Sequence, residues 1–313
     1  MNSPRTAPVD APAALSSTDP RRSIDLFAGL AMILFCLALG LQQVAIKGVA
    51  EDISPLAQIA LRSSLAAILV GALAYWRGTR LTDFRDRLGP GLLVGLGFTG
   101  EFVFVALGLN YTLASHMSVF LYTAPVFAAL GLHWLVPGEQ LARRQWLGIA
   151  LAFTGMVIAM SPESGQANTS ALLLGDALGL LAGLCWAATT LVLRRSSLSE
   201  APPLQTLTYQ LATAGLLLLP ITALSGDLGA LEATPLALAS LGFQALVISV
   251  GALLLWFTLL RRYWASQLGV FSFLSPIFGV LFGALLLDEP LTLPFLFGGG
   301  ILLGGLVLVS RQA

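Results

Sequence analysis

The sequence predicts an all-α polytopic membrane protein with ten transmembrane helices, built as two inverted five-helix repeats with both termini cytoplasmic. Three observations predict this fold class. The chain is 57% hydrophobic and only 10% charged, with a mean hydropathy of +0.86, whereas a soluble protein needs far more polar surface. Its apolar residues form runs long enough to cross a bilayer as helices. Its basic residues gather in alternate connecting segments, as expected of loops on one side of a membrane.

Residues 1–23 differ from the rest of the chain. They are rich in Pro, Ala, Ser and Thr and show no periodic apolar face, which predicts a disordered cytoplasmic tail. The alternative is a cleaved signal peptide. The apolar run from Ile24 to Ile46 is too long for the hydrophobic region of a signal peptide and has no clear cleavage site, which argues against that alternative.

Ten apolar segments approach the roughly 20 residues that a helix needs to cross the hydrocarbon core. The predicted spans are residues 24–47, 54–76, 90–109, 114–136, 145–161, 174–193, 204–225, 235–258, 266–287 and 291–310.

The basic residues orient these spans. With a cytoplasmic N-terminus, the outer segments hold only Lys47, and Arg62 lies within a span. The inner segments then hold 14 of the 16 basic residues, which supports ten spans with both termini inside the cell. These residues are Arg5, Arg21, Arg22, Arg77, Arg80, Arg85, Arg87, Arg143, Arg144, Arg194, Arg195, Arg261, Arg262 and Arg311.

The two halves of the chain, 24–161 and 174–310, resemble each other. The segment A-S-H-M-S-V-F at 114–120 aligns with A-S-Q-L-G-V-F at 265–271, and Cys36 and Cys185 occupy similar places in the first span of each half. Each half has five predicted spans. An odd number forces the second copy to enter the membrane from the other side, and such inverted repeats are typical of alternating-access transporters.

Further motifs follow the same order in both halves. They are A-L-x-x-N-Y-T-x-A-S at 106–115, the mid-span prolines Pro125 and Pro276, and the pattern Glu139…Gly148…Gly155 with its copy Glu289…Gly298…Gly305. With these motifs the chain resembles the drug/metabolite transporter superfamily in its EamA-type branch, over nearly all of its length after residue 24. Within that branch it looks most like the YddG-type exporters of aromatic amino acids. It departs from the family at residues 36–40, which read C-L-A-L-G where the family often has a Trp-Gly pair.

The resemblance implies a secondary transporter that exports small metabolites, with aromatic or neutral amino acids as the leading substrates, in a bacterial-type inner membrane. The alternatives are an exporter of drugs or other metabolites of the same superfamily, a lipid-handling protein or a channel. An enzyme is not expected, because the two histidines and the one deep carboxylate supply few parts for catalysis. No P-loop, metal cluster or cofactor motif is present. The expected partners are a small-molecule substrate and the bilayer, without nucleic acid.

Two charged residues lie well inside predicted spans, where each needs a stated reason because a charge in hydrocarbon is costly. Arg62 and Glu101 each lie eight residues from the outer end of their span, which is a depth of about 12 Å. Tyr122 reaches the same level and Gln244 lies close to it. A zwitterionic amino acid needs an acceptor for its ammonium and a donor for its carboxylate, and Glu101 and Arg62 supply these groups. The alternative is a buried ion pair that only fixes helix packing.

Other polar and aromatic residues complete the predicted substrate site. Tyr122 and Trp186 can stack on an aromatic side chain, and Gln43 and Ser272 are predicted to line the cavity. Pro125 and Pro276 remove helical hydrogen bonds in mid-span, so kinks suited to a gate are expected there.

Three further expectations concern structure. We expect His116 to be a wetted histidine near the outer face, although a role in proton coupling is the alternative. Glu139 and Glu289 are expected to favour the N-termini of the spans that follow them. The Gly-x-x-x-Gly pairs 91/95, 179/183, 279/283 and 300/304 are predicted to allow close helix packing.

Overall fold

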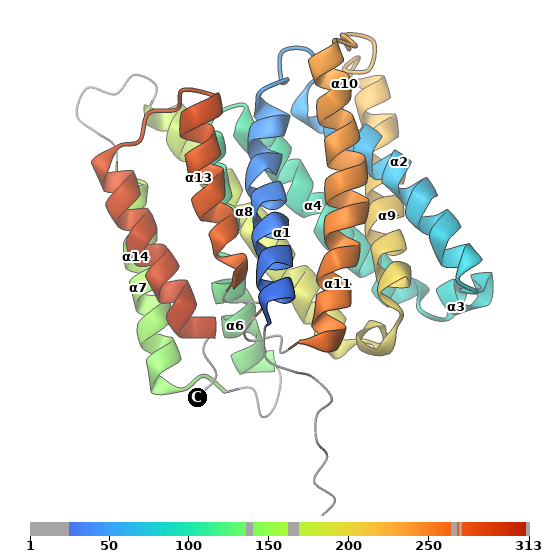
Figure 1. Ribbon diagram of the computed structural model, residues 1–313, viewed down its shortest axis with the longest axis horizontal. Coiled ribbons are helices and arrows are strands. Elements are labelled where there is room, and N and C mark those ends of the chain that lie inside the picture. Colours follow the sequence, from blue (N-terminus) through green and yellow to red (C-terminus); the bar gives the residue numbers. More distant parts are fainter. Residues whose placement is uncertain (1–24, 136–139, 162–168, 264–267, 269–270, 311–313) are drawn as a thin grey trace, which may run out of the picture.

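The structure, a computed structural model, describes residues 25–135, 140–161, 169–263, 268 and 271–310, and the regular elements of this part are helices (Figure 1). Eight helical stretches in this part are long and apolar enough to cross a membrane. They are α1 (Leu26–Lys47), α2 (Pro55–Trp76), α4 (Leu88–Leu109), α5 with α6 (Ala114–Leu135), α8 (Thr169–Arg195), α9 (Pro203–Leu224), the continuous stretch Pro235–Trp256, and α14 (Leu293–Ser310).

The other two predicted spans coincide with shorter helices. The helix α7 (Arg143–Ala159) has 17 residues, and α13 (Leu274–Leu286) has 13. A total of ten spans therefore stays a prediction. Two short helices that the apolar pattern did not predict are α3 (Leu81–Asp86), between α2 and α4, and η1 (Ser197–Glu200), after α8. Both are too short to show an apolar period.

Several helices begin where the sequence carries a capping residue followed by proline. The Ser54 hydroxyl accepts a hydrogen bond from the Ala57 amide at 3.3 Å, ahead of Pro55. The Thr234 hydroxyl accepts one from the Ala237 amide at 3.2 Å, ahead of Pro235. A side-chain oxygen satisfies an amide that the first helical turn leaves open, and proline has no amide to satisfy.

The kinks predicted at Pro125 and Pro276 are confirmed as breaks in the helix. The helix α5 (Ala114–Leu121) ends before Tyr122, and α6 (Ala124–Leu135) begins one residue ahead of Pro125. In the second half a turn at Phe273 precedes α13 and Pro276. Tyr122 and Phe273 are equivalent positions of the sequence repeat, so both halves break their fourth helix at the same place.

The eighth predicted span contains a stretch of π-helix. The helix α10 (Pro235–Gly242) runs into the π-helix η2 (Phe243–Ala252) and then into α11 (Leu253–Arg262). Within η2 the Ser249 hydroxyl donates to the carbonyl oxygen of Gln244, five residues earlier, at 3.0 Å. Stretches of π-helix are rare and often lie at functional sites. This one packs against α1 and α2.

Glycines lie in the most extensive contact between two helices, which joins α7 to α14. A Cβ atom at Gly148 would lie 2.8 Å from the carbonyl oxygen of Gly305, so both helices need glycine there. The prediction for Gly300 and Gly304 was wrong, because added Cβ atoms there meet nothing within 4 Å. Gly298 and Gly305 face α7 instead. The predicted close contacts at 91/95, 179/183 and 279/283 are confirmed.

Substitution of the glycines on α14 should separate its two faces. Gly298→Ala places a methyl group against the backbone of Gly155 and Ala159, and we expect a destabilisation of about 1–3 kcal/mol from overpacking. The matched control is Gly300→Ala, where the methyl group has open space. Thermal unfolding in detergent measures the difference. Equal midpoints for the two variants would contradict the packing of α7 on α14.

Candidate functional site

Helices α2 and α4 bring the two deep charges together. Arg62 is 2% exposed and Glu101 is 8% exposed, and each acts electrostatically on the other. The guanidinium carbon of Arg62 lies 4.1 Å from the centre of the Phe102 ring, which follows Glu101 in α4. The two residues thus share one level of the bundle.

Neither charge has a hydrogen-bond or ion-pair partner among the residues that the structure describes. Nε and Nη1 of Arg62 are fully buried without a partner. No hydrogen bond or ion pair involves the Glu101 carboxylate in the same ranges. Buried polar groups in proteins are almost always hydrogen-bonded, and a structural ion pair would bring these two groups into contact. In the described ranges, Arg62 and Glu101 therefore act on each other electrostatically without a hydrogen bond or ion pair between them.

An aromatic pair adjoins the acid. The Tyr122 and Trp186 rings meet edge to face, with centroids 5.4 Å apart and an interplanar angle of 87°. Tyr122 lies at the break between α5 and α6, and Trp186 lies on α8. Tyr122 is within electrostatic reach of Glu101, and so is Cys185, the neighbour of Trp186. Glu101 is thus linked electrostatically both to Arg62 and to Tyr122, and we call the ring pair of Tyr122 and Trp186 the aromatic wall.

Other buried polar groups lie on the surrounding helices. Gln43 of α1, which the sequence predicted for the site, is buried, and its Oε1 has no partner in the described part of the chain. The same holds for Gln42 Nε2 and Ser63 Oγ, which the sequence analysis did not assign to the site. Polar residues inside strongly apolar spans were the signal for them. Ser272 is partly buried one turn ahead of Pro276.

Gln244 belongs to a hydrogen-bonded group next to Arg62. Its Nε2 donates to Gln58 Oε1 at 2.8 Å and to Ser240 Oγ at 3.1 Å. Gln58 lies one turn before Arg62 on α2 and donates to the carbonyl oxygens of Ile46 and Ile53. The amide nitrogen of Gln244 is thus engaged, whereas its Oε1 has no partner in the described ranges.

Charged side chains hold the turn between α4 and α5, a feature that the sequence analysis missed. The Lys47 ammonium donates to the carbonyl oxygens of Leu109 and Thr112, at the C-terminal end of α4. The Glu289 carboxylate accepts hydrogen bonds from the Ala114 and Ser115 amides, at 2.6 and 2.9 Å. A cation at a helix C-terminus and an anion at a helix N-terminus both complement the helix dipole.

The prediction for Glu289 was therefore right in kind and wrong in place. It caps α5, in the other half of the chain, and not the span that follows it. The reason is tertiary: the segment after α13 lies beside the start of α5, where Glu289 also approaches Gly283. Glu139 lies outside the described residues.

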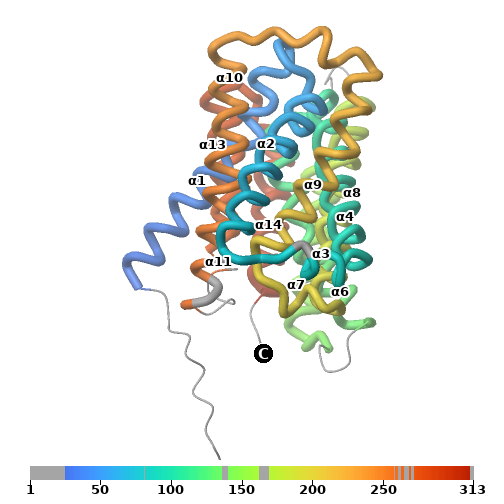
Figure 2. Tube along the Cα trace, turned by 90° about the vertical axis from the view of Figure 1, so that its right-hand side faces the viewer, coloured from blue at the N-terminus to red at the C-terminus, as the bar shows by residue number. Residues whose placement is uncertain are grey.

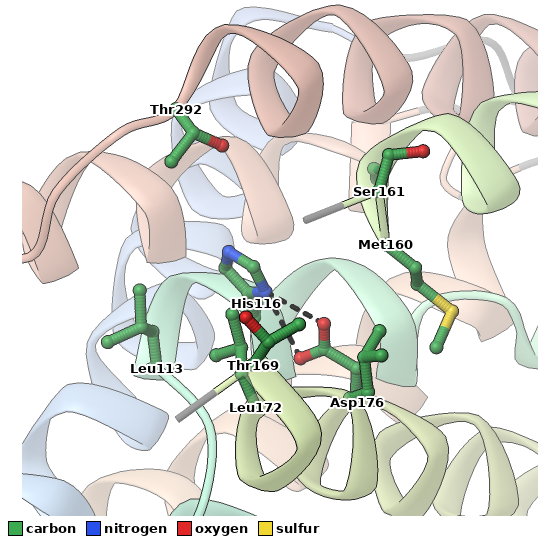
Figure 3. A pocket seen from close by; sticks show the side chains of 10 residues that line it. Leu113, His116, Met160, Ser161, Thr169, Leu172, Asp176 and Thr292 are labelled. Atoms are coloured by element: carbon green, nitrogen blue, oxygen red, sulfur yellow. Dashed lines mark hydrogen bonds and ion pairs between the residues drawn. The ribbon is translucent and has the colours of Figure 1, made fainter. Parts of the chain in front are cut away.

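His116 and Asp176 form a buried pair at the same end of the bundle. His116 Nδ1 lies 3.1 and 3.0 Å from Asp176 Oδ1 and Oδ2, and the side chains point toward each other in a small pocket (Figure 3). His116 is 4% exposed and stacks on Phe295 with centroids 4.1 Å apart, so the expectation of a wetted histidine was wrong. Asp176 is 1% exposed and also accepts a hydrogen bond from the Thr112 hydroxyl. The described residues contain no group of three or more His, Cys, Asp or Glu side chains that could hold a metal.

The eight helical stretches long and apolar enough to cross a bilayer define the class of the protein as a multi-pass helical membrane protein. The profile of the EamA-like transporter family matches residues 26–161 and again residues 173–311. The chain therefore belongs to the EamA-like transporter family, as the sequence motifs predicted at the level of the drug/metabolite transporter superfamily. The closer likeness to YddG-type exporters stays a prediction.

Individual relatives agree with this family. A "Probable amino-acid metabolite efflux pump" of Escherichia coli (strain K12) is 28% identical over 293 residues, which are 90% of this chain and 93% of that protein. An "Uncharacterized transporter" of Archaeoglobus fulgidus is 28% identical over 265 residues, 84% of this chain and 90% of that protein. One crystal structure superposes with a TM-score of 0.63 at 20% identity, covering 90% of this chain and 97% of the other, and supports the fold alone.

The cap on α5 makes a stability prediction. Glu289→Ala removes the acceptor of two amide hydrogen bonds, and hydrogen bonds to a charged group contribute about 1.5–3 kcal/mol each. We expect Glu289→Ala to have a clearly lower thermal unfolding midpoint in detergent than the wild type. The midpoint of Glu289→Gln should lie between those of Glu289→Ala and the wild type. Glu51→Ala, at an exposed position of the turn after α1, serves as the control. A midpoint for Glu289→Ala equal to that of the control would contradict the cap.

Proposed function

We propose that this protein is a secondary transporter that exports small zwitterionic metabolites, with aromatic or neutral amino acids as the leading candidates, by alternating access across a bacterial-type inner membrane. The observation that carries this proposal is the state of Arg62 and Glu101. Two opposite charges are buried at one level, interact electrostatically, and have no hydrogen-bond partner in the described part of the chain.

The chemistry of these groups specifies the ligand. The unpartnered nitrogens of Arg62 can donate to a carboxylate, and Glu101 can accept from an ammonium. A zwitterion satisfies both groups at once and leaves the site neutral, which reduces the cost of charges at this depth. A phosphorylated substrate would need several deep basic residues, whereas Arg62 is the one basic residue that the sequence places deep in a predicted span.

The aromatic wall adds selectivity for the side chain. Tyr122 and Trp186 present ring edges and faces beside Glu101, and aromatic pairs contribute about 0.5–1.5 kcal/mol beyond their buried area. We assign Gln43, Gln244 and Ser272 to the lining of the same path, and Pro125 and Pro276 to the helix breaks at which a gate can bend. The name of the Escherichia coli relative supports amino-acid metabolites as the substrate class. Drugs or other metabolites of the superfamily are the second candidate class.

The proposal includes the architecture. We infer ten spans in two inverted five-helix repeats, 24–161 and 174–310, with both termini cytoplasmic. The two separate matches of one family profile support the repeat. The end of the bundle where α8 finishes and α7 begins carries arginine pairs, at 143/144 and 194/195, and α14 also ends there (Figure 1). That distribution supports a cytoplasmic assignment for this end.

Neutralising each deep charge tests the substrate site. In proteoliposomes loaded with labelled amino acids, with and without a pH gradient, we expect Glu101→Gln and Arg62→Gln to lower export at least about tenfold, because each loses a charge-assisted hydrogen bond to substrate. Glu51→Gln and Arg85→Gln are matched controls at exposed positions. Unlabelled amino-acid esters, which lack the carboxylate, should compete poorly. Full export by both site variants, or no movement of any amino acid by the wild type, would refute the proposal.

The aromatic wall gives a second, independent test. Trp186→Ala should raise KM for phenylalanine or tyrosine about threefold to tenfold more than KM for alanine, because only an aromatic substrate loses the ring contact. Trp186→Phe should restore most of the difference. Export kinetics with each substrate measure it, and an equal rise in KM for all three amino acids would exclude Trp186 from side-chain recognition.

A further inference from the structure

Two hydrogen bonds tie down equivalent turns at opposite ends of the molecule. At one end the Thr112 hydroxyl donates to Asp176 Oδ1. At the other the Tyr263 hydroxyl lies 3.0 and 2.9 Å from Asp25 Oδ1 and Oδ2. Asp25 caps the start of α1, and Lys47 at the end of α1 donates to the Thr112 carbonyl. The 22 residues of α1 thus set the two hydrogen bonds about 33 Å apart.

The sequence repeat relates the two donors. The alignment of A-S-H at 114–116 with A-S-Q at 265–267 makes Thr112 equivalent to Tyr263. Each donor lies in the turn between the third and fourth predicted spans of its half. The structure describes the first such turn fully and the second as far as Tyr263.

The repeat also relates the two acceptors. The alignment of Cys36 with Cys185 sets Asp176 opposite position 27, two residues from Asp25. Each acid lies at the start of the first span of one half and binds the turn of the other half. For the pair Tyr263–Asp25, Figure 2 shows the start of α1 close to the end of α11. For the pair Thr112–Asp176, Figure 3 shows Asp176 beside the start of α5.

We propose that Thr112–Asp176 and Tyr263–Asp25 are the outer and inner latches of the transporter, which open in turn as the protein alternates its access. This inference rests on the proposed function, because it assigns a role to the two ends of the substrate path. Each latch joins one half of the chain to the other, so a movement of one half against the other must break one of them. Both latches are closed in this structure, and Arg62 and Glu101 lie between them.

Further side chains hold the outer latch. His116 contacts the same Asp176 carboxylate, while Lys47 and Glu289 hold the backbone on either side of Thr112. The position equivalent to His116 in the second half is Gln267 in the sequence. The imidazole at the outer latch therefore has no counterpart at the equivalent position of the second half.

The accessibility of one native cysteine, Cys185, can report which latch is open. Cys185 is half-buried beside Glu101, and in a Cys36→Ala background it is the single thiol of the chain. A membrane-impermeant, negatively charged methanethiosulfonate reagent reaches it only through an open path. Labelling rates are measured in right-side-out and inside-out vesicles, and their ratio gives the relative access from the two sides.

Opposite shifts of this ratio are the expected result. Thr112→Val should raise outside-to-inside labelling about fivefold, the effect of losing one net hydrogen bond. Tyr263→Phe should lower the ratio by a similar factor. Thr222→Val, which removes a buried hydroxyl bonded within its own helix, and Tyr75→Phe, which alters an exposed ring, should leave it unchanged. Asp176→Asn and Asp25→Asn are second variants in case a first variant is not inserted.

Two outcomes overturn the latches: shifts in the same direction for the Thr112 and Tyr263 variants, or no shift in either. The experiment also distinguishes failure of the latches from failure of the proposed substrate. Opposite shifts in a protein that moves no amino acid would retain the latches and remove the substrate assignment. Amino-acid export by variants whose labelling ratio equals that of the wild type would remove the latches alone.

Discussion

The cost of placing charge in hydrocarbon constrains this structure more than any other interaction. Arg62 and Glu101 lie on neighbouring helices with an aromatic ring against the guanidinium group, so the protein shields the cation with Phe102 and does not bring it into contact with the anion. This arrangement leaves both groups able to bind a ligand. Both helices pack closely on α9 through glycines, since Gly95 of α4 meets Thr213 and Gly215 of α9 meets Ser64 of α2.

The positions of the helices could be predicted because hydropathy is a strong signal in a membrane chain. The predicted spans coincide with helices. The depth argument placed Arg62, Glu101 and Tyr122 at one level, and in the structure Glu101 is in electrostatic reach of both of the others. The length of an apolar run shows where a helix crosses the bilayer, and the rise per residue then gives the depth of each side chain along that helix.

The contacts between distant segments could not be predicted in the same way. Glu289 was expected to serve the span that follows it, and it caps α5 of the other half. His116 was expected to face water, and Asp176 buries it. In both cases a polar residue near a span end satisfies a partner far away in sequence. One chain without an alignment gives no signal for such pairs, because their geometry depends on how the two halves dock.

The π-helix η2 has a consequence for any helical-wheel description of this span. In a π-helix each backbone amide bonds to the carbonyl five residues back, whereas in an α-helix it bonds to the carbonyl four residues back. The turns of η2 are therefore wider than those of an α-helix. A face assigned from α10 and carried forward at the usual angle per residue falls out of phase by the time it reaches α11. The helical register of the span therefore shifts across η2, and positions after Ala252 do not continue the faces of α10.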